Sequence, residues 1–211
     1  RLPRLNALDE TIPFLYVARY LAGDASELPR LGRTLRHAFE NVGFYYLRGH
    51  DVPESMIAAT FAEAKRFHAQ PMDRKLAVRI NEHNIGYMPM GGSLARTSKV
   101  NNNTKPSVNE AFFLRRERTP DDPDVIAGTK LRGLNQWPAN LPGFRTTVLA
   151  YMAALESLCK RLVPISEVAR ALTTAYFDRM FTNPTMVQRL SIDPPHPAYT
   201  TTITYLPPPT N

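Results

Sequence analysis

The chain has 211 residues, of which 43% are hydrophobic and 21% charged, and its formal net charge is +7 at pH 7. This composition is typical of a globular protein, and no apolar run reaches the roughly 18 residues that a transmembrane helix needs. The lysine and arginine residues are scattered, and no basic block or nucleic-acid-binding module is recognisable. We therefore expect neither a membrane nor a nucleic-acid partner.

The single cysteine, Cys159, excludes an internal disulfide. It lies among leucines at helical spacing, so we expect a buried structural thiol rather than a nucleophile. Residues 1–4 lead into no signal-peptide core. Together these features predict a cytoplasmic protein.

The N-terminal third of the sequence predicts alternating strands and helices. Residues 11–17 have strand character, and a helix with leucines at helical spacing follows over residues 26–42. The next segment, Phe44–Leu47, predicts a short aromatic strand that is buried on both faces. A second helix is expected to start near Pro53, and a short helix is expected over residues 73–78.

Regular structure is expected to fade between residues 81 and 108, where glycines and a run of asparagines favour turns. A loop of this length in a compact domain usually has a function. Strand character returns over residues 109–117, and a long amphipathic helix is expected over residues 142–162. Pro164 should end or kink that helix, and a shorter helical piece is expected over residues 168–177.

Five short motifs are spread along the chain. They are residues 41–53 (NVGFYYLRGHDVP), 86–92 (GYMPMGG), 109–114 (NEAFFL), 132–138 (RGLNQWP) and 181–184 (FTNP). In their order and approximate spacing they resemble the N-terminal region of the isopenicillin N synthase-like oxygenases, which use Fe(II) and usually 2-oxoglutarate. The resemblance extends over about residues 5–190.

The resemblance implies an α+β fold in which helices pack on the strands of a double-stranded β-helix (jelly roll), and this chain is expected to carry only the N-terminal part. It implies one region over residues 1–190, followed by a proline- and threonine-rich tail over residues 191–211 that departs from the family. Within the tail, residues 199–205 have strand propensity, while the flanking prolines equally favour an extended or disordered terminus.

The resemblance also implies Fe(II) and 2-oxoglutarate as cofactors and a small molecule as the substrate. In this family two histidines and one carboxylate hold the iron, and the first pair is spaced as His-x-Asp or His-x-Glu. None of the five histidines here has a carboxylate two residues later, and the downstream Arg-x-Ser of the family is absent. We therefore expect no catalytic residue, no metal ligand and no cofactor-binding residue in this chain.

Substrate contacts are a separate question, because segments near the glycine-rich loop approach the substrate in relatives. The resemblance therefore makes Tyr87, Met88 and Met90 candidates for substrate binding. Asn103 in the same loop is a candidate contact for an acidic substrate, and Arg189 is a candidate contact for carboxylates in the site. For each residue, the competing interpretation is loop packing or a structural ion pair.

The histidines have simpler interpretations. His50 lies in a strand-to-helix turn, which predicts packing or capping of that turn rather than metal binding. His37 and His68 lie on predicted helices beside charged neighbours, so both are expected at the surface.

Two functional hypotheses follow. In the first, the chain is part of a 2-oxoglutarate-dependent oxygenase and lacks most of the catalytic barrel. In the second, it is a non-catalytic fragment or remnant that binds a partner, or forms a homo-oligomer through exposed sheet edges, since open edges invite association.

Overall fold

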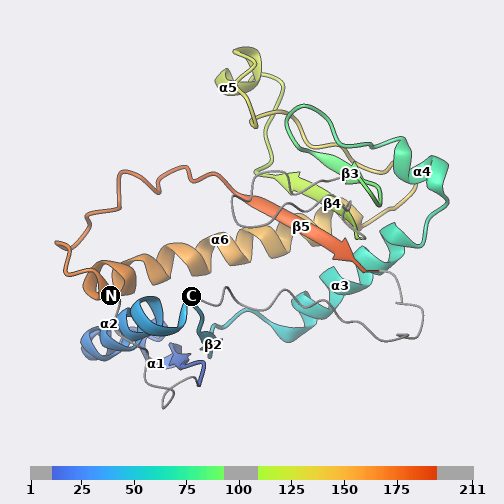
Figure 1. Cartoon of the computed structure of the whole chain (residues 1–211). Coiled ribbons are helices and arrows are strands. Elements are labelled where there is room, and N and C mark those ends of the chain that lie inside the picture. The colour runs from blue at the N-terminus through green and yellow to red at the C-terminus, as the bar shows by residue number, and fades with distance from the viewer. Residues whose placement is uncertain (1–10, 93–108, 194–211) are drawn as a thin grey trace, which may run out of the picture. The chain divides into compact units, whose positions relative to one another are not determined.

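A computed structural model describes residues 11–92 and 109–193 of the chain (Figure 1). The chain forms two compact units, each built from two stretches of sequence. The first unit consists of Arg1–Glu63 and Ala139–Met186, and the second of Ala64–Pro138 and Val187–Asn211. Within the described ranges, no helix is both long and apolar enough to cross a membrane.

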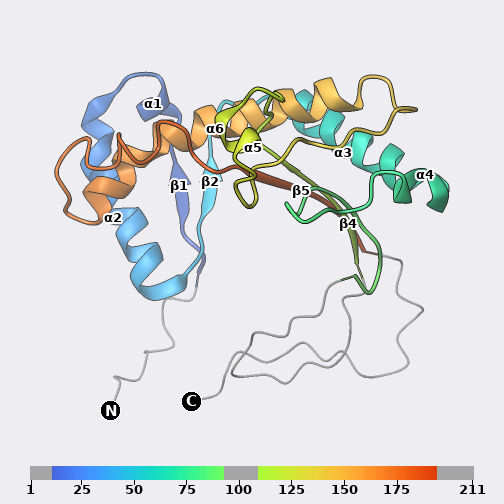
Figure 2. The same cartoon turned by 90° about the horizontal axis from the view of Figure 1, so that it is seen from above.

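The first unit combines a two-stranded sheet with helices. Its elements in chain order are β1 (Phe14–Tyr16), α1 (Ala18–Leu21), the 3-10 helix η1 (Ala25–Glu27), α2 (Leu28–His37), the π-helix η2 (Ala38–Val42), β2 (Tyr46–Arg48) and α6 (Phe144–Ala169). Strands β1 and β2 pair in parallel, with Leu15 opposite Leu47, and they run side by side in Figure 2. Helix α3 (Glu54–His68) begins in the first unit and ends in the second.

The core of the first unit lies where the sheet meets helices α2 and α6. Its buried residues are Leu15, Val17, Leu31, Leu35, Ile165 and Ala169. Each large aliphatic side chain buried here contributes roughly 1.5–3 kcal/mol. The two helices approach closely at Gly32, where an added Cβ would lie 2.4 Å from Val168 Cγ1. The helix contact therefore requires a residue without a side chain at this position.

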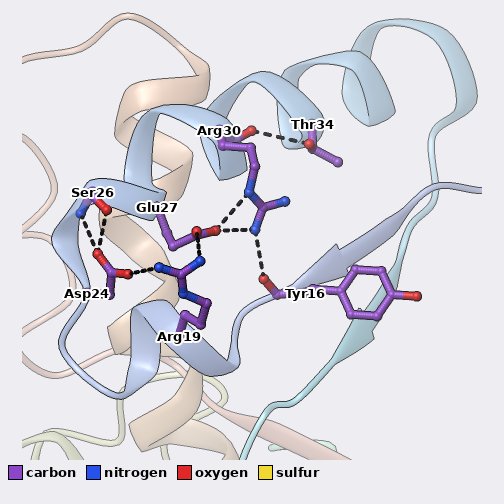
Figure 3. A network of polar contacts seen from close by, with 7 residues as sticks. All are labelled: Tyr16, Arg19, Asp24, Ser26, Glu27, Arg30 and Thr34. Atoms are coloured by element: carbon purple, nitrogen blue, oxygen red, sulfur yellow. Dashed lines mark hydrogen bonds and ion pairs between the residues drawn. The ribbon is translucent and has the colours of Figure 1, made fainter.

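A polar network on the surface links β1, α1, η1 and α2 (Figure 3). The Arg19 guanidinium bridges Asp24 at 2.7 Å and Glu27 at 3.3 Å. Arg30 also pairs with Glu27, and it donates to the Tyr16 carbonyl at 3.3 Å. Such exposed pairs typically contribute ~1 kcal/mol or less each. The network therefore guides the path of the chain more than it stabilises the unit.

Pro164 does not end the long helix, because α6 continues through it to Ala169. Proline removes one backbone donor from the helix. The next residue, Ile165, is fully buried in the core, and the Tyr20 hydroxyl donates to the Arg161 carbonyl at 3.1 Å. Packing of the residues that follow the proline thus outweighs the lost hydrogen bond.

The helical piece expected over residues 168–177 is wrong, since α6 ends at Ala169 and residues 174–180 form turns. The Glu167 carboxylate, which is almost fully buried, accepts hydrogen bonds from the backbone N–H groups of Ala175 at 3.1 Å and Phe177 at 3.0 Å. Helical geometry would direct these donors to backbone carbonyls instead. The buried carboxylate therefore specifies the turns.

The aromatic strand near residue 46 is not buried on both faces, which corrects the sequence-based expectation. Phe44 is 70% exposed and Tyr46 is 52% exposed. The face of the sheet that carries Leu15 packs into the core of this unit. On the other face Phe14 and Tyr46 stack, with ring centroids 5.1 Å apart. A sheet of two strands covered on one side leaves the outward rings in solvent.

Cys159 is exposed rather than buried, which is a second correction. The buried stripe of α6 passes through the neighbouring Leu158 and on to Ile165. A step of one residue turns a helical side chain by about 100°, which takes the thiol out of the stripe.

The second unit contains a three-stranded antiparallel sheet in the order β3–β4–β5. Its elements are α4 (Met72–Leu76), β3 (Gly86–Met88), β4 (Glu110–Arg115), α5 (Pro123–Ile126) and β5 (Val187–Ile192). Strand β3 lies in the segment where no regular structure was expected, because three residues are too few to produce a strand pattern. Strand β5 extends to Ile192, past residue 191, where the tail was expected to start. The strand considered for residues 199–205 lies outside the described residues.

The close approach at Gly32 leads to a stability prediction. Gly32→Ala should lower the free energy of unfolding by about 1–3 kcal/mol, because the added Cβ would overlap Val168. Alanine is the better helix former by ~1 kcal/mol, so a net loss would identify the helix contact as its cause. Urea unfolding measures the change, and Gly32→Ala/Val168→Ala should recover most of it. A single variant as stable as the parent would contradict the contact.

Candidate functional site

The sheet of the second unit carries most of the residues predicted to bind substrate. Its register places Tyr87 opposite Phe112, and Phe113 opposite Arg189. Side chains alternate between the two faces along each strand, and paired residues share a face. The first face carries Tyr87, Glu110, Phe112, Gln188 and Leu190, and the second face carries Met88, Ala111, Phe113, Arg189 and Ser191.

Aromatic rings pack against the first face. The Phe67 ring, near the end of α3, lies 4.6 Å from the Phe112 ring and 5.9 Å from the Tyr87 ring, measured between centroids. Trp137 lies 6.5 Å from Phe112, and its indole N–H donates to Glu117 at 3.3 Å. Phe67, Tyr87 and Phe112 are fully buried. The first face is therefore part of the core.

A buried carboxylate lies within this apolar surface. Lys75 Nζ donates to the two oxygens of Glu110, at 3.1 Å to Oε1 and 3.0 Å to Oε2. The Tyr87 hydroxyl donates to Oε2, and His68 Nδ1 lies 3.1 Å from Oε1. We call His68, Lys75, Tyr87 and Glu110 the Glu110 cluster. All four residues are buried, so these contacts replace the water that the carboxylate loses on folding.

The cluster shifts the titration of two of its members. Burial disfavours ionised Glu110, but hydrogen bonds from Tyr87 and Lys75 and the nearby charges of Lys75 and His68 outweigh it. The pKa of the Glu110 carboxyl therefore lies below its ordinary value. Burial, together with the hydrogen bond to Glu110 and its charge, raises the pKa of the Tyr87 hydroxyl well above its usual range. Glu110 is thus an anion and Tyr87 a neutral donor at neutral pH.

The second face presents an exposed cation. The Arg189 guanidinium lies over the Phe113 ring, 5.3 Å from the centroid, and donates to Asn109 Oδ1 at 3.0 Å. Among the described residues no carboxylate forms an ion pair with Arg189, whose side chain is exposed. Met88 lies on the same face and is buried. This face therefore combines apolar surface with a positive group held in place by an aromatic ring.

The structure brings only some of the predicted substrate-binding residues together. Met88 and Arg189 share the second face of the sheet, whereas Tyr87 points into the core on the first face. Met90 lies beyond the end of β3 and is 53% exposed. Asn103 lies outside the described residues.

The Glu110 cluster was not predicted from the sequence, and the expectation that His68 lies at the surface is wrong. The His68 side chain is 2% exposed and contacts Glu110, which is 42 residues away in sequence. One local signal was available, since Glu110 directly precedes the apolar run of β4. A carboxylate at the start of a buried strand indicates a buried partner.

The described residues do not fit an iron site. They include no group of three or more His, Cys, Asp or Glu side chains able to hold a metal ion. The predicted role of His50 in its turn is confirmed, because the backbone N–H of Val52 donates to His50 Nδ1 at 3.3 Å. His37, by contrast with His68, is exposed as expected.

The lowered pKa of Glu110 gives a prediction with a defined sign. The ionised carboxylate stabilises the folded state above the ordinary glutamate pKa near 4.3, and this contribution is lost as the pH falls through the lower pKa of the folded state. Glu110→Gln should cost about 3 kcal/mol at neutral pH, because it leaves Lys75 buried beside a neutral group. The cost should shrink in acid. Urea unfolding across this pH range measures it, with the exposed Glu82→Gln as the control.

Gln188 provides a second prediction, with an internal control. Its amide nitrogen and oxygen are both buried, and neither has a hydrogen-bond partner among the described residues. Gln188→Leu should therefore raise the free energy of unfolding by about 1 kcal/mol. Gln136→Leu should lower it by a similar amount, since the Gln136 amide donates to the carbonyls of Arg79 and Ile85. Thermal or urea unfolding that places both variants on the same side of the parent would contradict this assignment.

Comparison with known proteins identifies the family. Residues 12–140 match the family described as non-haem dioxygenase in morphine synthesis, N-terminal. The 2-oxoglutarate-Fe(II) type oxidoreductase hxnY of Emericella nidulans is 29% identical over 171 residues, which cover 79% of this chain and 48% of that protein. The 2-oxoglutarate-dependent dioxygenase eupC of a Phoma species is 30% identical over 156 residues, covering 72% of this chain and 49% of that protein. The chain thus spans about half the length of these curated relatives.

Solved structures share the fold. A full-length protein of Neurospora crassa in complex with alpha-KG superposes with a TM-score of 0.67 at 22% identity, covering 88% of this chain and 55% of that one. A putative 2OG-Fe(II) oxygenase family protein from Caulobacter crescentus gives a TM-score of 0.63 at 22% identity, covering 81% of this chain and 52% of that one. Since the family match extends over more than half of its residues, this chain belongs to the non-haem, 2-oxoglutarate/Fe(II)-dependent dioxygenase family.

Proposed function

We propose that the protein containing this chain is an Fe(II)- and 2-oxoglutarate-dependent oxygenase that oxidises a small molecule. The names of the relatives support this activity, since they specify 2-oxoglutarate and Fe(II). The described residues do not supply the iron ligands. To the described part of this chain we assign the binding and orientation of substrate.

The observation that carries this proposal is the difference between the two faces of the β3–β4–β5 sheet. The first face is core, filled by aromatic rings and the Glu110 cluster. The second face holds Phe113 and Arg189, whose guanidinium has no carboxylate partner among the described residues. A ring and an available cation side by side suit a substrate with an apolar body and an anionic or strongly polar group.

We assign the predicted contact residues to this arrangement as follows. Arg189 contacts the substrate directly, and Met88, which is buried on the same face, lies behind that contact. The exposed Met90, beyond the end of β3, is a further contact. Tyr87 has an indirect role, because it lies on the first face and its hydroxyl donates a hydrogen bond to the buried Glu110 carboxylate. Asn103 stays a predicted contact for an acidic group of the substrate.

The same proposal extends to the fold. Strands β3, β4 and β5 belong to the double-stranded β-helix of the full enzyme, and this chain contributes the N-terminal part of that barrel. The alternative is a non-catalytic fragment or remnant that self-associates or binds a partner. It is not favoured by the relatives, whose names describe oxidoreductases and dioxygenases.

Anaerobic titration with Fe(II) in the presence of 2-oxoglutarate tests the function. Two polypeptides should be compared, namely the 211-residue chain and the product of the complete reading frame that encodes it. The complete product should show the absorption band of the iron chelate and should consume 2-oxoglutarate when oxygen is admitted. The absence of both from the complete product would overturn the proposal.

Arg189 gives a prediction specific to substrate binding. In the complete enzyme, Arg189→Gln should raise KM for the substrate about tenfold, which corresponds to ~1.4 kcal/mol of binding free energy. The consumption of 2-oxoglutarate without substrate should be unchanged, because that reaction does not use the second face. Steady-state kinetics measures both rates. Arg179→Gln, which removes an exposed arginine of the first unit, is the matched control, and an equal change in both variants would contradict the role of Arg189.

A further inference from the structure

His68 sits in an arrangement that defines the protons on its ring. Its Nε2 atom lies 3.0 Å from the Leu190 carbonyl, which can only accept a hydrogen bond, so Nε2 carries a proton. Its Nδ1 atom lies 3.1 Å from Glu110 Oε1. A single proton lies between these last two atoms, on the ring or on the carboxyl group.

The surroundings of Glu110 place that proton on the ring. Lys75 Nζ contacts both carboxylate oxygens, and the Tyr87 hydroxyl donates to Oε2. Donors directed at both oxygens favour the ionised carboxylate, and the lowered pKa of Glu110 agrees. An ionised Glu110 leaves Nδ1 as the donor, which makes the ring doubly protonated.

The charges that face the ring come from several elements. Glu110 on β4 is the anion in contact with it, and Tyr87 on β3 lies with its ring centroid 6.5 Å away as a neutral group. Lys75 on α4 is a nearby cation, since its ammonium donates to the His68 carbonyl at 3.3 Å. Its charge disfavours a positive charge on the His68 ring. His68 is also the last residue of α3, and the carboxyl end of a helix favours a cation.

We propose that His68 is held as an imidazolium and that its two N–H groups form a clasp between α3, β4 and β5. Strand β5 is at the edge of the described sheet and pairs only with β4 there. The bond from Nε2 to Leu190 gives this edge strand a second attachment. The positions of β5, and of Arg189 on its other face, then depend on this attachment.

Nitrogen-15 NMR of ring-labelled histidine in the 211-residue chain tests the charge state. Both ring nitrogens of His68 should show the chemical shifts of protonated nitrogens at neutral pH. Contacts of its ring protons with Phe67 and Tyr87 assign the signals without any variant. A ring with one unprotonated nitrogen at neutral pH would overturn the proposal, and His37, which is exposed, serves as the reference signal.

Hydrogen exchange tests the clasp itself. His68→Gln should accelerate amide exchange along β5 at least about tenfold relative to β1 and β2, because the edge strand loses an attachment. His37→Gln should leave exchange along β5 unchanged. If His68→Gln does not fold, the nitrogen-15 shifts of the parent decide alone. A folded His68→Gln that leaves exchange along β5 unchanged would refute the clasp.

Discussion

The contact between the Glu110 carboxylate and the Lys75 ammonium, buried under the sheet, is the constraint on which the second unit depends. Removing a carboxylate from water costs several kcal/mol, and only well-placed donors offset that cost. Here the donors come from α3, α4 and β3, while the acceptor is on β4. The carboxylate is therefore satisfied only when these elements have assembled in one arrangement, which an apolar core alone would specify less sharply.

The two faces of this sheet carry different kinds of side chain. Aromatic packing and the buried ions occupy one face, so its side chains are constrained by their neighbours. On the other face Met88 and Ala111 are also buried, while Arg189 is exposed over the Phe113 ring. Under the proposed function, substitution of Arg189 would alter substrate preference and leave the Glu110 cluster intact.

Long helices were predictable from the sequence, because α2, α3 and α6 repeat their apolar residues at the helical period. Strand β3 was not, since a strand of three residues is defined by its pairing with β4 rather than by its own pattern. The continuation of α6 past Pro164 depends on contacts with the core. The members of the Glu110 cluster were equally hidden, because each resembles a surface residue until the fold brings them together. The family itself was recognisable, since its motifs are local.

Two residues that occur once each in the sequence lie in different units. Trp137, the single tryptophan, belongs to the second unit beside Phe112, and the single cysteine, Cys159, is exposed on α6 of the first unit. Tryptophan fluorescence therefore reports on the sheet unit alone, while a dye attached to the thiol reports on the helical unit. The native chain thus carries a separate optical probe for each half, and whether the two halves unfold together can be read without introducing any label site.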